Sequence, residues 1–443
     1  MRHHLAFFLS IAALVWLGAP CHSGAQPAPS PEPTAPPAAA TESDFTALRM
    51  SGFLVASVSY NSKLQMVPEF AGGTPALSKP GAVNFGFDKV GLTFARMLAP
   101  WLTASVSVEV ESHRDVHSHG FDPDFGCFGD GPCVERFGAE EPEVVVNLDR
   151  FNVTAVAPAG NGVAFSLGRF DVPFGIERHD EVMLTTATTS EVFRYARPQR
   201  MSGLQVAYAF GPVVDVAAWV VNRWESETSG VHDANDNNEG KSLGGRLGLT
   251  PMAHERLLNF GLGGFFGPEQ DGGESPTRWV VSADGTWAPG ARSFVATEWV
   301  WGGEDGVEMR ERGTPIAAPA ETVDSSWKGF YVLGHHDVME ELGITLRYGW
   351  LDDEDGARTG VAQKLSSWTF TPVVHLSRLV HGLRSTGAAF ARTRHPIDVL
   401  DLKLEYRLNK SDRTVFSAAE PAADITDAGK SSHQVQLQLA WNF

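Results

Sequence analysis

Apolar and polar residues alternate along much of this chain. Every second residue from Leu102 to Val110 is apolar, and the residues between them are Ser, Thr or Glu. The segments 399–408 and 434–443 repeat the pattern, with Leu, Tyr, Trp or Phe opposed to charged residues or Gln. Successive side chains of a strand point to opposite faces, so each segment predicts a strand of about ten residues with one apolar face. Such strands build either a half-exposed sheet or a membrane barrel.

The positions of the aromatic residues favour the membrane barrel. Many lie at the ends of predicted strands, where amphipathic rings sit well at the level of lipid headgroups. A soluble exported β-sandwich, which is the alternative, gives this placement no reason. The residues concerned are Tyr60, Trp101, Trp224, Trp287, Trp299, Trp301, Trp350, Trp441 and Phe443.

The connections between predicted strands alternate in length. Short turns, such as Ala99-Pro100 and Pro289-Gly290, are followed by long polar loops, such as 171–199 and 302–324. Short turns at one end and long loops at the other are typical of outer-membrane barrels, and the spacing predicts an all-β, antiparallel transmembrane barrel of about sixteen strands. Residues 378–396 are too long for a short turn. They hold either a helix or an extra strand pair, so about eighteen strands remain open.

Membrane insertion demands closure of this sheet. An open edge would leave N–H and C=O groups without partners in hydrocarbon. A barrel of about sixteen strands encloses a lumen wide enough for water. The polar positions of the alternating segments suit such a wet interior.

The chain divides into three parts. Arg2, the apolar run Leu5–Leu17 and the small residues before Gln26 predict a secretory signal peptide over residues 1–25. Residues 26–43 are rich in Pro and Ala, which predicts an extended or disordered arm. Residues 44–443 form the predicted barrel.

The net charge and the cysteine content indicate which partners are excluded and how the cysteines are paired. The formal net charge of −18 argues against a nucleic-acid partner, because phosphate backbones would be repelled. Cys21 leaves with the signal peptide. The remaining Cys127 and Cys133 lie six positions apart in a Gly-, Asp- and Pro-rich stretch, and in an oxidising compartment they most simply form one disulfide.

Two motifs and the chain end resemble outer-membrane porins. Residues 167–177, LGRFDVPFGIE, are similar to the G-R-F-x-x-P-F-G-x-E stretch of the phosphate-selective porin O/P family and the related OmpL-like porins. Residues 404–412, LEYRLNKSD, resemble the penultimate strand of those porins. The terminal Phe443 resembles the C-terminal signal by which bacterial barrels are recognised for insertion. The resemblance implies a bacterial outer-membrane channel for passive diffusion of small hydrophilic solutes or ions.

The resemblance also implies that residues 171–199 are a third loop that folds into the lumen. This stretch is rich in charge, as expected for a constriction where facing acidic and basic groups select hydrated ions. Ordinary solvated loop charges are the alternative reading. The candidate constriction residues are Arg178, His179, Asp180, Glu181, Glu191, Arg194, Arg197 and Arg200.

Other functions find less support in the sequence. No nucleophile, acid/base pair or cofactor fingerprint emerges, so we expect neither an enzyme nor a bound cofactor. A plugged barrel with a surface-binding or structural role, and a barrel hydrolase, remain alternatives. His113, His117 and His119 are spaced to hold Zn²⁺ or Cu²⁺, but loop histidines without a rigid scaffold are weak metal candidates.

The expected partners follow from this reading. They are outer-membrane lipid and lipopolysaccharide, the barrel assembly machinery, and small hydrophilic solutes or ions. A homotrimer and a monomer are both open. Because the chain is strongly acidic, we expect weak cation preference or little selectivity.

Overall fold

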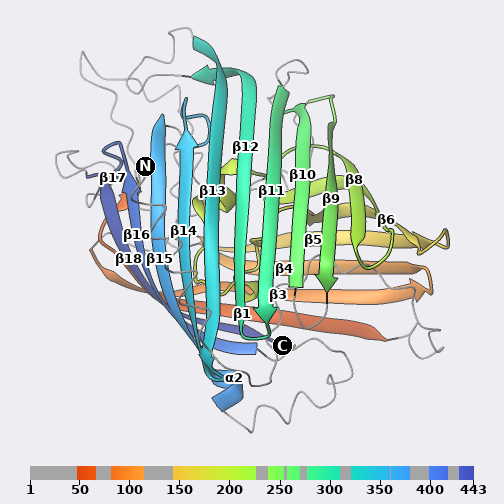
Figure 1. Ribbon diagram of the computed structural model, residues 1–443, viewed down its shortest axis with the longest axis horizontal. Coiled ribbons are helices and arrows are strands. Elements are labelled where there is room, and N and C mark those ends of the chain that lie inside the picture. The colour runs from red at the N-terminus through yellow and green to blue at the C-terminus, as the bar shows by residue number, and fades with distance from the viewer. Residues whose placement is uncertain are drawn as a thin grey trace.

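The strands close into one ring. The computed structural model describes residues 47–65, 81–113, 143–225, 238–253, 257–269, 277–309, 321–359, 361–379, 399–417 and 429–443. Sixteen antiparallel strands form the closed barrel, so the predicted fold class is confirmed (Figure 1). The barrel strands are β1 (Leu48–Asn61), β3 (Val83–Ala99), β4 (Leu102–His113), β5 (Glu143–Ala157), β6 (Val163–Asp171), β7 (Arg200–Ala209), β8 (Val214–Val221), β9 (Ser242–Ala253), β10 (Leu257–Pro268), β11 (Thr277–Gly290), β12 (Ser293–Met309), β13 (Glu321–Met339), β14 (Leu342–Asp353), β15 (Gln363–His375), β16 (Val399–Ser411) and β18 (Ser431–Asn442).

Closure is made by the first and last strands. β1 pairs with β3 on one side and with β18 on the other, from Phe53↔Asn442 to Asn61↔Gln434. Beyond the last strand, the amide of Phe443 donates to Gly52 O, and Gly52 N–H donates to Phe443 O, each at 2.8 Å. Every strand thereby has two neighbours, as a lipid-exposed sheet requires.

Short elements supplement the barrel. β2 (Leu64–Gln65) and β17 (Phe416–Ser417) pair with each other as a separate two-stranded sheet. Helical turns occur at η2 (Glu181–Met183), η3 (Val192–Ala196) and α2 (Leu376–Leu379). Within the described part of the chain, no helix is long and apolar enough to cross a membrane.

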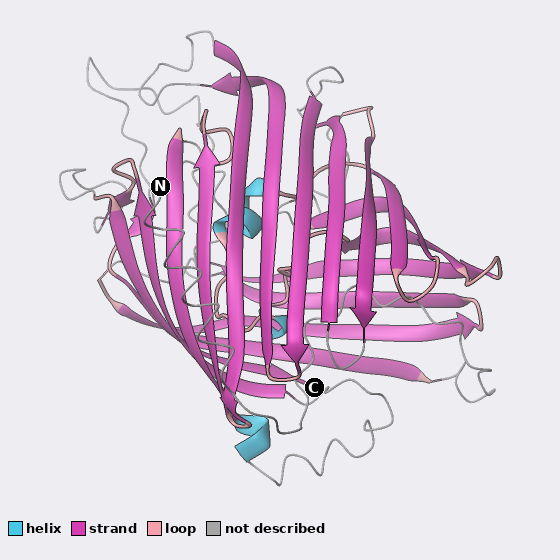
Figure 2. Ribbon diagram, in the orientation of Figure 1, coloured by secondary structure: helices cyan, strands magenta, loops and turns pink. Residues whose placement is uncertain are grey.

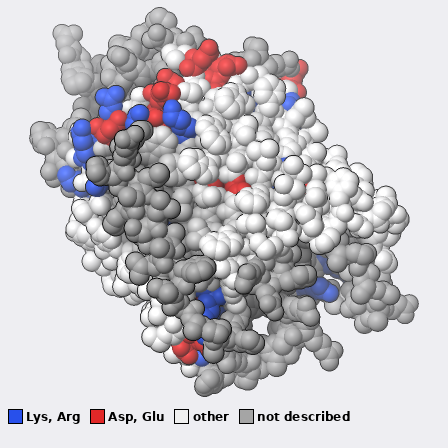
Figure 3. Space-filling model, in the orientation of Figure 1, with Lys and Arg blue, Asp and Glu red and all other residues white. Residues whose placement is uncertain are grey.

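The alternation of side chains follows the predicted pattern. In β16, Lys403, Glu405 and Arg407 point inward and are buried, whereas Leu404 and Tyr406 are exposed on the outside. In β18 the Gln residues point inward. Figure 3 shows charged side chains gathered near the edges of one face, with a broad, largely uncharged surface between them. An apolar exterior around a polar interior is what a membrane barrel needs.

The outer aromatic residues form contacts across strands. The ring centroids of Trp299 and Phe330 lie 4.5 Å apart, and those of Tyr348 and Trp368 lie 4.6 Å apart. Trp224 is the exception among the aromatic residues that the sequence places at the membrane interface. It is only 4% exposed and packs inside the barrel against Trp327 and Phe265, so its assignment to the membrane interface is wrong. The connection that follows β8 turns inward at this residue.

Two further expectations change. β15 pairs directly with β16, so no additional strand pair enters the ring between them and the eighteen-strand alternative is wrong. Part of 378–396 is described, and there α2 ends at Leu379.

The predicted loop 302–324 is too long, because β12 and β13 continue to pair as far as Met309↔Glu321. Polar residues such as Glu304 misled the prediction, although Glu304 is a buried residue of β12, which extends together with β13 beyond the strands on either side of this pair (Figure 1).

Several predictions fall outside the described residues. These are the signal peptide 1–25, the arm 26–43, the disulfide between Cys127 and Cys133, and the loop histidines His117 and His119. His113 ends β4, but its side chain is not described.

The motif glycine Gly168 allows a close approach of β5 to β6. Its φ is +135°, and a Cβ there would lie 2.0 Å from Phe151 O. We predict that Gly168→Ala lowers the free energy of unfolding by about 1–3 kcal/mol, because both backbone strain and a backbone clash oppose the methyl group. Urea titration in detergent micelles, followed by heat-modifiable gel mobility, measures the change.

Gly334→Ala is the matched control. A Cβ at Gly334 meets nothing within 4 Å, and the residue also lies in a barrel strand. Equal stability of the two variants would contradict the role assigned to Gly168.

Candidate functional site

The segment 172–199, called here the lumen loop, crosses the inside of the barrel. It leaves β6, and its turn η3 contacts β12, β13 and β14 on the opposite wall, while η2 contacts β1 and β18. Figure 2 shows these helical turns behind the front strands. The loop predicted from the 167–177 motif therefore does fold inward.

The loop first attaches where it turns at Gly175. This residue has a φ of +77°, and a Cβ would lie 2.4 Å from Glu298 Oε1, so only glycine fits without displacing that carboxylate. Ile176 N–H donates to Glu298 Oε2 at 3.0 Å, and Glu177 N–H donates to Tyr331 Oη at 3.1 Å. The P-F-G part of the motif thus seats the loop backbone on side chains of β12 and β13.

Buried arginines hold the middle of the loop. Arg347 of β14 pairs with Glu177 at 2.7 Å and donates to Thr188 O at 2.5 Å and to Thr189 O at 3.1 Å. Arg407 of β16 donates to Thr189 O at 2.7 Å and pairs with Glu191 at 2.5 Å. Each guanidinium has several donors in a fixed geometry, so one side chain satisfies carbonyls and a carboxylate together.

Two other wall residues complete this attachment. Glu405 Oε2 accepts the amide proton of Ala187 at 2.7 Å. Lys403 Nζ donates to Thr186 O at 3.2 Å and to Glu181 O at 2.9 Å. The Thr- and Ala-rich stretch 185–189 has no strand or helix partners for its backbone, and buried backbone groups without partners are costly. The charged wall of β14 and β16 supplies those partners.

The loop returns over an apolar base. Val192, Tyr195 and Ala196 pack into the buried cluster that includes Trp327 and Tyr331. Trp327 Nε1 donates to Ala196 O at 2.9 Å. Burial of this apolar surface adds hydrophobic stabilisation to the polar attachments.

The near wall also contacts the loop. His179 Nε2 lies 2.9 Å from Lys89 Nζ of β3, and Arg150 of β5 pairs with Asp180 at 3.0 Å. Arg200, at the start of β7, pairs with Asp149 and Asp171. The lumen loop is therefore attached to both sides of the barrel.

The eight predicted constriction residues divide by exposure. His179, Glu191, Arg197 and Arg200 are at most 6% exposed, and each has a charged neighbour; for Arg197 it is Glu298 at 2.8 Å. The other four are Arg178, Asp180, Glu181 and Arg194, which are partly exposed. The buried four thus attach the loop, and Asp180 does so as well through Arg150. All of the partly exposed four retain some contact with solvent.

Some attachment residues were not identified from the sequence. Arg347 stands between Leu346 and Tyr348, so its inward position was available from the alternation. Arg358 gave no such signal, because it lies in the connection after β14. Its guanidinium lies 4.8 Å from the Trp224 ring and 5.2 Å from the Trp327 ring, and its Nε donates to Tyr195 O at 2.8 Å.

Burial and neighbouring charges shift the pKa of the loop groups. Burial acts to raise the pKa of Glu191, because it disfavours the charged carboxylate. The positive charges of Arg407 and Arg347 together have a larger, opposite effect, so the pKa lies below its usual range. For Asp180, burial is likewise outweighed, chiefly by Arg150, and the pKa is lowered. Burial, with Arg278 nearby, lowers the pKa of Arg358 to about 10. All three groups are ionised at neutral pH.

Two side-chain groups among the described residues have the composition of a metal centre. They are Glu109, Asp149 and His179, and His335, Asp337 and His375; in each, the ligand atoms lie within 4.8 Å of one another. The first group already contains the ammonium of Lys89, which is 3.6 Å from Glu109. The predicted candidates His117 and His119 lie outside the described residues, and the side chain of His113 is not described.

Comparisons with solved structures agree with the barrel. An anion-selective porin from Comamonas acidovorans is similar with a TM-score of 0.51 and 14% identity, covering 90% of this chain and 99% of its own. The outer membrane channel DcaP of Acinetobacter baumannii is similar with a TM-score of 0.50 and 13% identity, covering 89% and 97%. At such identities the likeness shows the fold alone. No curated protein sequence matches the chain.

A family model identifies the chain more closely. The model described as "Putative beta-barrel porin-2, OmpL-like" matches residues 119–441, which is most of the chain. This match includes the lumen loop and its attachments on β14 and β16. The chain therefore belongs to this OmpL-like family of β-barrel porins and is an outer-membrane protein with a channel fold.

Proposed function

We propose that the protein is a porin whose water-filled channel passes small hydrophilic solutes or ions by passive diffusion. The observation that carries the proposal is the lumen loop, which crosses a closed sixteen-strand ring whose inner wall is polar. Solutes then pass beside the loop, where the partly exposed Arg178, Asp180, Glu181 and Arg194 face the water path. Porins of this family and fold typically have no enzymatic activity. Stepwise conductance in planar bilayers tests the proposal.

The channel has weak cation preference or little selectivity. The net charge of −18 supports this, because acidic groups raise the local concentration of cations at a channel mouth. Acidic and basic side chains are both present among the partly exposed loop residues, which favours a modest preference over a strong one.

A plugged barrel is the second candidate. One observation favours it: the lumen loop is bonded to both walls, through Arg347 and Arg407 on one side and Arg150 on the other. A plugged barrel would fold and insert, but it would pass no current. Silent bilayers with inserted protein would therefore replace the channel proposal with a binding or structural role.

Charge removal in the lumen loop tests the water path. A unit charge about 8 Å from an ion in water is worth about 0.5 kcal/mol, or about a twofold change in permeability ratio. We expect Glu181→Gln to lower the cation-to-anion permeability ratio by about this factor and Arg178→Gln to raise it. Reversal potentials across a KCl gradient measure both.

Arg292→Gln serves as the control for these variants. Arg292 lies in the turn between β11 and β12, outside the lumen loop, and its guanidinium is 4.0 Å from the Glu340 carboxylate. Shifts of the same sign for both loop variants, or equal shifts in the control, would count against the assigned path.

The buried arginine of β14 tests the attachment of the loop. Arg347→Gln removes a cation from buried Glu177, and breaking a buried pair typically costs about 3–5 kcal/mol. We expect the barrel to assemble while the loop loosens, so that single-channel currents become larger and noisier. Single-channel recording, with heat-modifiable mobility as the check on folding, measures this.

Arg246→Gln is the matched control, because Arg246 also faces the lumen but pairs with Asp215 of the neighbouring strand. Quiet, wild-type currents in the Arg347→Gln channel would refute the attachment.

We also propose that residues 1–25 direct export of the chain. The barrel then contacts lipopolysaccharide and associates as a homotrimer. The barrel assembly machinery recognises Phe443. Phe443 supports its part in two ways: its backbone closes the ring on Gly52, and its side chain lies 4.8 Å from the Trp441 ring. Cross-linking in intact outer membranes tests the trimer.

Deletion of Phe443 is expected to lower the fraction of chains that reach the folded, heat-modifiable form in the outer membrane. The deletion removes both the proposed signal and two closing hydrogen bonds. Phe443→Tyr keeps the aromatic ring and the backbone, and it should assemble normally. Normal assembly of the deletion variant would disprove the signal.

A further inference from the structure

A second polar cluster lies inside the barrel and apart from the lumen loop. It consists of His335 and Asp337 near the end of β13 and His375 at the end of β15, and is called here the mouth cluster. This is the end of the barrel with the short turns. His335 is 7% exposed and Asp337 is 2% exposed, so the cluster is largely withdrawn from solvent.

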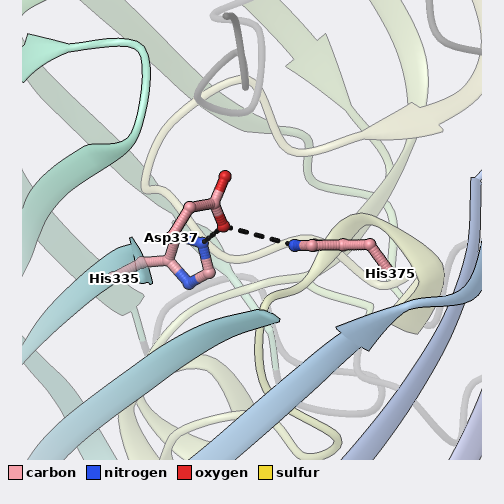
Figure 4. A group of neighbouring side chains, drawn as sticks. All are labelled: His335, Asp337 and His375. Atoms are coloured by element: carbon pink, nitrogen blue, oxygen red, sulfur yellow. Dashed lines mark hydrogen bonds and ion pairs between the residues drawn. The ribbon is translucent and has the colours of Figure 1, made fainter. Parts of the chain in front are cut away.

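The three side chains converge on one point. His335 Nε2 lies 3.0 Å from Asp337 Oδ1, and His375 Nε2 lies 3.2 Å from the same oxygen (Figure 4). Neighbouring ligands around a cation bound at 2.0–2.1 Å are separated by about 3 Å, so this convergence has the dimensions of a coordination sphere. The two imidazoles approach from different strands, as Figure 4 shows.

The outer nitrogen of each imidazole has its own partner. His335 Nδ1 lies 2.8 Å from Thr345 Oγ1, and His375 Nδ1 lies 2.8 Å from Asp401 Oδ1. Metal-binding histidines typically use one nitrogen for the metal and the other for a carboxylate or similar group, which fixes the ring. Arg378 Nη1 lies 3.5 Å from Asp337 Oδ2, on the other oxygen of the carboxylate.

A glycine makes room for the cluster. A Cβ at Gly343 of β14 would lie 2.6 Å from His335 Cε1 and 2.9 Å from Asp337 Oδ1. The neighbouring strand therefore permits the two side chains to lie against its backbone. This space would be lost with any other residue.

The other candidate group differs in its charges. Around Glu109 and His179, the ammonium of Lys89 already occupies the position between the ligand atoms, at 3.6 Å and 2.9 Å. In the mouth cluster, the structure gives one contact with an arginine and none with a lysine among the described residues. Arg378 contacts Asp337 Oδ2, which is not the oxygen that the two imidazoles share.

We propose that His335, Asp337 and His375 bind one divalent transition-metal cation of the Zn²⁺ type, through two imidazole nitrogens and one carboxylate oxygen. Imidazole with carboxylate suits Zn²⁺ and its neighbours, and three protein ligands leave further positions for water or a passing solute. The cation displaces the protons that otherwise join the three side chains. Asp401 and Thr345 orient the two rings.

The test is titration of ZnCl₂ into the detergent-solubilised barrel, purified without a histidine tag, by isothermal calorimetry. Wild-type protein is expected to bind one Zn²⁺ per chain. His335→Ala and His375→Ala should weaken binding at least tenfold, and Asp401→Asn should weaken it about 10- to 100-fold through the orientation of His375. The assay needs no conductance, so its outcome is independent of the channel proposal.

His336→Ala is the matched control, because this adjacent histidine is exposed and bonds to Ser293 on the opposite face. It should bind Zn²⁺ as the wild type does, and so should His117→Ala/His119→Ala. Heat-modifiable mobility confirms that each variant is folded, and Asp337→Asn provides a variant of unchanged shape. Absence of wild-type binding, equal losses for His335→Ala and His336→Ala, or loss through the loop histidines overturns the proposal.

Discussion

Backbone hydrogen bonding governs this structure. In hydrocarbon, an N–H or C=O group without a partner is costly, so a sheet survives only if its edges meet. The pairing of β1 with β18, extended by Phe443 and Gly52, removes those edges. The apolar outer face and the polar inner face follow from the same arrangement, because each strand separates lipid from lumen with alternate residues.

The same constraint explains the charged inner wall. The lumen loop enters a space where its backbone has no sheet to join, and Arg347, Arg407, Glu405 and Lys403 provide the missing partners. Burying so many charges is favourable only when each is paired or hydrogen-bonded. Residues expected to act on ions therefore act first on the loop itself, as the burial of Arg197 and Arg200 shows.

The polar interior is organised in two levels. Toward the end with the long loops, Arg358 lies against the rings of Trp224 and Trp327 and donates to Tyr195 O of the lumen loop. At the opposite end, the mouth cluster is built from β13 and β15 and supported by β14 and β16. Rigid strands hold both levels, so side chains distant in sequence keep fixed relative positions.

The inward loop after the LGRF motif was implied by the resemblance to porins. Local pattern by itself determined the all-β class, the approximate strand number, and the inward positions of β16 and β18. These follow from the two-residue period of a strand and from turn lengths, which are properties of adjacent residues. Tertiary structure alone decided which loop charges are buried, that Trp224 turns inward, and that His335 meets His375. Such contacts depend on how barrel closure brings separate strands together. The alternation of residues within one strand carries no information about which strands meet.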